Sequence, residues 1–272
     1  MWLINMDKKI VYTNSIVIAV LLVTATLSGL FMKNLYKHDT NSIISQMMGQ
    51  DIVTLLVAVP LLLISVYMIH GNSMRGRLIW MGTLFYFSYT YALMSFLASY
   101  NQLFLVYVAI FSISMYTLIG ELITTRFIGL KSKFKPGKLI KITAAFLIFI
   151  ALMLAMMWLK LIIDSLITGT TPAALEGYTT LVIQALDLGV LVPAAIISAV
   201  LLLKNNAWGY TLTSIFLIKA SLIGTTILSM IVFMILNSVS VDPGQIIIFT
   251  TMTILGILVT VGFYKRINGD LS

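Results

Sequence analysis

The fold of this chain is decided by residues 180–236, which read TLVIQALDLGVLVPAAIISAVLLLKNNAWGYTLTSIFLIKASLIGTTILSMIVFMIL. Two apolar segments flank the polar turn at 204–206 (KNN), and each is long enough to cross a lipid bilayer as a helix. Asp187 lies inside the first segment and Lys219 inside the second. Because a charge at membrane depth costs several kcal/mol, it is normally kept for a partner or a function. The stretch therefore predicts a transmembrane hairpin that carries two internal charges.

The composition predicts the same class of protein for the whole chain. Its 272 residues are 60% hydrophobic and 10% charged, with a mean hydropathy of +1.05. A soluble domain of this size cannot cover its surface with so few polar residues, whereas a lipid-facing one does not need to. Helices are expected because a β-barrel requires strict alternation in segments of about ten residues, and none is visible. We predict an all-α, polytopic membrane bundle that forms one transmembrane domain over residues 1–272.

Residue counts exclude or disfavour several kinds of site. The chain has no cysteine, which excludes disulfides, thiolate catalysis, iron–sulfur clusters and cysteine zinc sites. Its two histidines, His38 and His70, fall at or beyond the ends of predicted helices, which disfavours a buried bis-histidine haem. We predict no catalytic residue, metal site or cofactor, and enzyme activity is not the expectation.

Apolar runs separated by charged or polar breaks predict eight membrane spans. A cleavable leader is not expected, because the first run is longer than a signal-peptide core and no small-residue cleavage site follows it cleanly. The spans are 10–32, 52–70, 79–98, 103–124, 139–159, 180–203, 209–236 and 244–264.

The net charge of +8 is explained by membrane topology. With the N-terminus inside, all but four of the 17 Lys and Arg residues fall in cytoplasmic segments, as the positive-inside rule requires. We therefore predict both termini in the cytoplasm of a plasma membrane, and no nucleic-acid partner. A cysteine-free chain without an extramembrane domain favours a prokaryotic source. The cytoplasmic set comprises Lys8, Lys9, Arg75, Arg77, Arg126, Lys131, Lys133, Lys135, Lys138, Lys141, Lys204, Lys265 and Arg266.

The densest basic run lies between the predicted fourth and fifth spans. We interpret it as a topology determinant, which every such protein needs. The alternative is a patch that binds anionic lipid headgroups. The residues concerned are Lys131, Lys133, Lys135 and Lys138.

A short motif occurs twice, with the copies separated by close to half the length of the chain. VAVP at 57–60 is followed by Ile-Ser, and VLVP at 190–193 is followed by Ile-Ser at the same distance. The separation between Pro60 and Pro193 is called the repeat interval below. A parallel four-plus-four duplication with halves 1–135 and 136–272 would produce this pattern. Coincidence in a Val- and Ile-rich chain is the alternative. Each proline removes a backbone hydrogen bond in mid-membrane, so each frees a carbonyl that can kink a helix or line a cavity.

Three polar residues of the predicted sixth span share one helix face, because Thr180, Gln184 and Asp187 are four and three positions apart. The helix rise places Asp187 about 7 Å outward of mid-span and Lys219, in the next span, about 5 Å inward of it. A direct ion pair then requires a flexible lysine or a tilted helix, and water or a polar substrate between the charges is the alternative. We predict that Asp187, Lys219, Gln184 and Thr180 bind a substrate or an ion. The competing interpretation is a structural pair that fixes the two helices together.

Other polar and aromatic residues receive structural interpretations. Asp51 is expected to cap the outer start of the second span. Glu121 is expected to pair with Arg126 at the membrane surface. Phe85 and Tyr89 have helical spacing on an aromatic-rich span, where helix packing is the expectation and a pocket for a planar or cationic ligand is the alternative. Interfacial anchoring is expected of Trp80, Trp158 and Trp208.

The leading functional hypothesis is a small secondary transporter or ion-coupled permease, with its site between the predicted sixth and seventh helices. One alternative is a membrane-embedded enzyme or a protein that binds a cofactor or lipid, although the clustered carboxylates and histidines that such chemistry usually needs are missing. A retinal Schiff base on Lys219 is a variant of it, but Ile215 stands where the usual microbial rhodopsin pattern has Asp. The other alternative is a non-catalytic membrane subunit or sensor.

Overall fold

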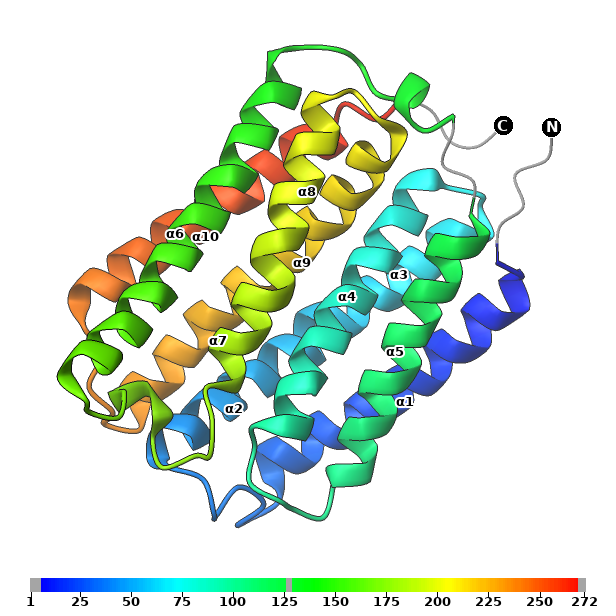
Figure 1. Ribbon diagram of the computed structural model, residues 1–272. Coiled ribbons are helices and arrows are strands. Elements are labelled where there is room, and N and C mark those ends of the chain that lie inside the picture. The colour runs from blue at the N-terminus through cyan, green and yellow to red at the C-terminus, as the bar shows by residue number, and fades with distance from the viewer. Residues whose placement is uncertain (1–5, 126–128, 269–272) are drawn as a thin grey trace.

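The computed structural model describes residues 6–125 and 129–268, which form a bundle of long helices (Figure 1). The protein is 80% helical, and the described ranges contain no strand. The elements are α1 (Lys8–Phe31), α2 (Asn41–Val53), the π-helical turn η1 (Thr54–Ala58), α3 (Val59–His70), α4 (Met74–Phe96), α5 (Phe104–Thr124), the 3-10 turn η2 (Lys131–Lys133), α6 (Lys138–Thr168), the 3-10 turn η3 (Ala173–Leu175), α7 (Val182–Leu186), the π-helical turn η4 (Asp187–Leu191), α8 (Val192–Leu203), α9 (Ala207–Leu236) and α10 (Pro243–Tyr264).

Within the described residues, seven continuous helices are long and apolar enough to cross a membrane: α1, α2–η1–α3, α5, α6, α7–η4–α8, α9 and α10. The prediction of an all-α protein is therefore confirmed, and the apolar helices indicate a multi-pass membrane protein. The remaining predicted span, 79–98, corresponds to α4, which has 23 residues but is not among the seven. Most of α4 is buried, and it packs between α3, α5 and α9. Because its side chains meet protein rather than lipid, α4 has less need to be apolar.

The second helix begins earlier than the sequence suggests. Its predicted start at residue 52 is replaced by a start at Asn41, where the Thr40 hydroxyl caps the helix by accepting the backbone N–H of Ile43. The interpretation of Asp51 as an N-terminal cap is therefore wrong, because Asp51 lies in mid-helix and is only 2% exposed. The predicted start came too late because this part of the helix contains polar residues. Several of them, such as Ser45, face the protein interior.

Two π-helical turns interrupt helices at positions related by the repeat interval. The turn η1 begins at Thr54 and η4 begins at Asp187, and a proline follows each in the first turn of the next helix. A proline lacks an N–H and its ring clashes with the carbonyl four residues earlier, so a wider π turn at this point relieves both problems. The prolines are Pro60 and Pro193.

The repeat interval also relates the two connections that follow. Asn72 and Asn205 both have positive φ angles, of 59° and 56°, which Asn tolerates better than most residues. The next helices, α4 and α9, begin at Met74 and Ala207, and these starts are separated by the same interval. In Figure 1 the helices from α6 onward (green to red) lie on one side, and α1, α3, α4 and α5 (blue to green) lie on the other.

Helix ends that carry the predicted cytoplasmic charges meet at one end of the bundle, here called the basic end. The Lys8 ammonium, at the start of α1, donates to the Asn72 side chain at 2.8 Å. The Arg75 guanidinium, at the start of α4, donates to the backbone carbonyl of Ile267 beyond α10. Arg126, which the sequence also assigns to this side, lies outside the described residues.

The prediction that Trp80 anchors at the membrane interface is wrong. Trp80 is fully buried and donates its indole N–H to the Ser15 hydroxyl at 2.8 Å, so it is not an interfacial anchor. The predicted span end at residue 79 was wrong, because α4 begins at Met74 and places Trp80 well inside the bundle. Trp208 is exposed at the start of α9, as an anchor would be.

Replacing Gly209 with alanine should lower the free energy of unfolding by about 1–3 kcal/mol, the usual cost of overpacking. A Cβ on Gly209 would lie 2.2 Å from the backbone nitrogen of Leu202, where α9 crosses the end of α8. Gly189→Ala is the matched control, because its Cβ meets nothing within 4 Å. Denaturant unfolding in detergent measures both. Equal stability of the two variants would contradict the close approach of α8 and α9.

Candidate functional site

Asp187 accepts two hydrogen bonds from neutral donors inside the bundle. It opens the π turn η4 and is 6% exposed. Its Oδ1 accepts the hydroxyl of Tyr89, on α4, at 2.5 Å. Its Oδ2 accepts the indole N–H of Trp158, on α6, at 2.8 Å. The aspartate therefore joins three helical segments that are distant in the sequence.

Lys219 reaches the same group of residues through an aromatic ring. Its side chain, on α9, is 2% exposed, and its ammonium lies 3.8 Å from the centroid of the Tyr89 ring. The Phe85 ring centroid is 5.9 Å from the same nitrogen. A cation over a desolvated aromatic face gains up to about 2 kcal/mol. Tyr89 thus stands between the charges, with its ring toward Lys219 and its hydroxyl on Asp187.

The two charges are neighbours but do not form a direct ion pair. Within the described ranges, the ion pairs closer than 4 Å are Arg77–Glu121 and Lys160–Asp164. The five residues Asp187, Tyr89, Trp158, Lys219 and Phe85 are called the Asp187–Lys219 cluster below. The sequence predicted that the two charges would lie on neighbouring helices at different depths, and it missed the aromatic side chains that connect them.

The ammonium of Lys219 has N–H groups that are not used in hydrogen bonds. In the part of the chain that the structure describes, it makes no hydrogen bond and lies over the two aromatic rings. An ammonium has three N–H donors, and leaving them unpaired in a buried site is costly. Asp187, in contrast, has a donor on each oxygen. The cluster is therefore equipped to receive an acceptor, such as an anionic oxygen, at Lys219.

Gln184 and Thr180 differ in their positions. Gln184 is buried in α7, one turn before Asp187, as the predicted shared face requires. Thr180 is exposed and precedes α7, which begins at Val182, so it does not lie on that helix face. The backbone of Leu181 is not helical, so the helix begins at Val182 and not at Thr180, where the predicted span starts.

A neutral counterpart of the charged pair lies in the first half of the chain. The repeat interval relates Thr54 to Asp187 and Tyr86 to Lys219. The Tyr86 hydroxyl lies 3.0 Å from the Thr54 hydroxyl and 3.0 Å from that of Thr226 on α9. Hydroxyl groups therefore occupy the positions at which the second half of the chain carries charges.

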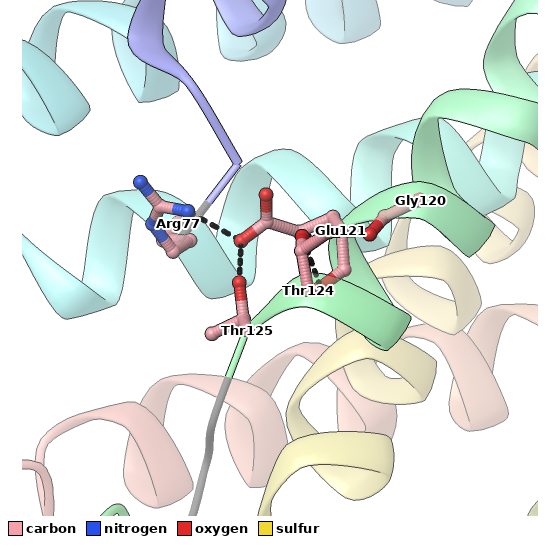
Figure 2. Close-up of polar contacts among 5 residues, drawn as sticks. All are labelled: Arg77, Gly120, Glu121, Thr124 and Thr125. Atoms are coloured by element: carbon pink, nitrogen blue, oxygen red, sulfur yellow. Dashed lines mark hydrogen bonds and ion pairs between the residues drawn. The ribbon is translucent and has the colours of Figure 1, made fainter. Parts of the chain in front are cut away.

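A second buried charge pair lies near the basic end, where Figure 2 shows Arg77 and Thr125 converging on one oxygen of Glu121. Arg77 and Glu121 are 4% and 0% exposed. The expected surface position of Glu121 is wrong, because Glu121 is buried and binds Arg77, and its expected partner Arg126 lies outside the described residues. The error came from counting Arg77 as part of a loop, whereas α4 begins before it.

Converting Tyr89 to phenylalanine should lower the free energy of unfolding by about 1.5–3 kcal/mol, the worth of a hydrogen bond to a charged group. The variant keeps the ring beneath Lys219 and removes the hydroxyl from Asp187. Tyr116→Phe is the control, because Tyr116 is exposed on α5. Thermal unfolding in detergent compares the two. If Tyr89→Phe loses no more stability than Tyr116→Phe, the hydrogen bond between Tyr89 and Asp187 does not stabilise the protein.

Within the described residues, no group of three or more His, Asp or Glu side chains is placed to hold a metal ion. Comparison with protein-family models, with curated proteins and with solved structures found no match to this chain.

Proposed function

We propose that this chain is a small secondary transporter that binds the anionic group of a small solute at Lys219. The observation that carries the proposal is a buried ammonium without a hydrogen bond, beside an aspartate that neutral donors already satisfy. A purely structural pair would be expected to place the two charges in direct contact. An ionisable residue inside a membrane is taken as functional by default. An unpaired hydrogen-bond donor is suited to a ligand that binds reversibly.

The proposed topology has eight spans, with α4 as the eighth. Its 23 residues are enough to cross a bilayer, and its burial explains its polar content. An even number of spans puts both termini on one side, and the lysines and arginines of the basic end assign that side to the cytoplasm. Lys131, Lys133, Lys135 and Lys138 then act as topology determinants at the start of α6 in a prokaryotic plasma membrane.

The proposed architecture is a duplication of four helices, with α1–α5 and α6–α10 as its halves. Matched π turns, prolines, left-handed asparagines and helix starts, all related by the repeat interval, support it. An even number of spans per half gives the halves the same orientation, as in transporters with parallel repeats. Tyr89 comes from the first half, and Asp187, Trp158 and Lys219 come from the second. A site shared by two halves suits alternating access, in which one half moves against the other.

A ligand screen followed by a flux assay tests this function. Small anions and zwitterions are added to the purified protein, and a ligand at 100 times its Kd should stabilise the wild type by about 2.7 kcal/mol. The same ligand should stabilise Lys160→Met, whose exposed lysine pairs with Asp164, and should not stabilise Lys219→Met. Liposomes with the wild-type protein should then transport it. A ligand that stabilises Lys219→Met equally, or that binds without flux, would overturn the proposal.

A further inference from the structure

A carboxylate separate from the Asp187–Lys219 cluster is buried in the first half of the chain. Asp51 lies on α2, near the end of that helix, and its Oδ2 accepts the hydroxyl of Tyr36 at 2.8 Å. Neither ion pair of the described residues includes Asp51. An isolated charge in the membrane interior is too costly to persist, so this carboxylate must be neutralised by something that it binds.

The groups buried around Asp51 are tyrosines. Tyr36 comes from the connection between α1 and α2, Tyr86 and Tyr91 from α4, and Tyr107 from α5, and all four are buried. Among the described residues, no lysine, arginine or histidine forms an ion pair with Asp51, and the exposed residues Lys33 and Lys37 line the pocket described below. The Tyr107 hydroxyl is buried beside this group and, within the same residues, has no hydrogen-bond partner. Asp51 is thus surrounded by neutral hydroxyl groups and has no ion-pair partner among the described residues.

The hydrogen-bond partner of Asp51 lines a pocket. A pocket of about 270 Å³ lies at the end of the bundle opposite the basic end, and both Gly29 and Tyr36 line it. A Cβ on Gly29 would lie 1.9 Å from the Asp51 Oδ2 and 2.4 Å from the Tyr36 hydroxyl, so a glycine here leaves room for the pair. The hydroxyl that contacts Asp51 therefore belongs to a residue of the pocket wall.

We propose that Asp51 is a proton-binding site that exchanges with water on the outer side through the pocket at Gly29 and Tyr36. A proton bound to the carboxyl group leaves no net charge at Asp51, which the absence of an ion-pair partner among the described residues requires. The Tyr36 hydroxyl both donates and accepts hydrogen bonds, so it can partner the ionised and the protonated carboxyl group. The proton comes from water and returns to it, with no other bond made or broken. This site is independent of Lys219 and of whether the chain transports a solute.

Infrared difference spectroscopy on the purified full chain tests the proposal. Replacing H₂O by D₂O at neutral pH in sodium-free buffer should shift the carbonyl band of a protonated carboxyl group. The band should be lost in Asp51→Asn and kept in Asp39→Asn, which alters a carboxylate of the outer loops bonded to Tyr178. Tyr36→Phe should keep the band but move it, because the carboxyl group loses its hydrogen-bond partner. This second variant keeps the test decisive if Asp51→Asn does not fold.

Two results would overturn the proposal. If the wild type and Asp51→Asn show the same bands, Asp51 is ionised or does not exchange its proton with water. A band that disappears when sodium is added at constant pH would mean that the carboxylate binds a metal cation in place of a proton.

Discussion

Replacing Arg77 with methionine should lower the free energy of unfolding by about 3–5 kcal/mol, the usual cost of removing one partner of a buried ion pair. Glu121 would keep its bond from the Thr125 hydroxyl and lose the one cation that pairs with it among the described residues. Its second oxygen already lacks a partner among the described residues, so nothing there can compensate for the loss. Arg77 is also packed inside the bundle, and removing its guanidinium leaves space at the start of α4.

A double-mutant cycle in detergent measures this effect. Arg77→Met combined with Glu121→Leu should recover most of the lost stability, because replacing a buried ion pair by apolar residues is often neutral or stabilising. Lys160→Met is the control, since the Lys160–Asp164 pair is exposed and such pairs contribute about 0–1 kcal/mol. A control as destabilised as Arg77→Met, or a double variant that loses the sum of both single losses, would contradict a buried pair.

The membrane class was predictable because lipid-facing helices must be apolar over their whole length. The helices that the sequence misjudged are those that face protein. The first turns of α2 carry polar side chains that point inward, such as Ser45, and the sequence assigned them to a loop. For the same reason α4, which is mostly buried, was predicted as the span 79–98 but is not among the seven helices that are apolar enough to cross a membrane by length and composition. Hydropathy reports contact with lipid, and interior helices have little of it.

The candidate site was predictable only in its charged residues. Asp187 and Lys219 stand out because charges are rare in apolar segments. Tyr89 is 98 residues from Asp187 in sequence, and Trp158 is 29 residues from it. Helical periodicity shows which residues share a face of one helix, but it does not show which helices are neighbours. The prediction for Thr180 failed for a local reason. The backbone of Leu181 is not helical, so the helix begins only after Thr180.

The proposed duplication makes the two halves unequal in a way that bears on function. At equivalent positions, the first half pairs two hydroxyl groups, on Thr54 and Tyr86, and the second half has Asp187 and Lys219. A hydroxyl pair satisfies itself in the interior without a charge, so the fold does not need charges at these positions. Two ionised side chains that the fold does not need are a cost to stability, and proteins retain such costs where function requires them.

Asp187→Asn and Lys219→Met should therefore have unequal consequences for stability. Asp187→Asn should cost about 3–5 kcal/mol, because it leaves the Lys219 ammonium without a counter-charge. It also turns an amide N–H toward one of the two donors that the carboxylate accepts. Lys219→Met should cost less, because the carboxylate that loses its neighbouring cation keeps both of its hydrogen-bond donors, and an ammonium without hydrogen bonds is removed from the interior.

Thermal unfolding of the wild type, both single variants and the double variant distinguishes a binding site from a structural pair. The double variant should recover the part of the Asp187→Asn loss that comes from the unpaired ammonium. If both single changes cost several kcal/mol and the double variant returns to wild-type stability, the charges hold α7–η4–α8 against α9, and the proposed site is wrong. If Lys219→Met is as stable as the wild type and no longer responds to a stabilising solute, the lysine is retained for binding, because nothing in the stability of the fold then requires it.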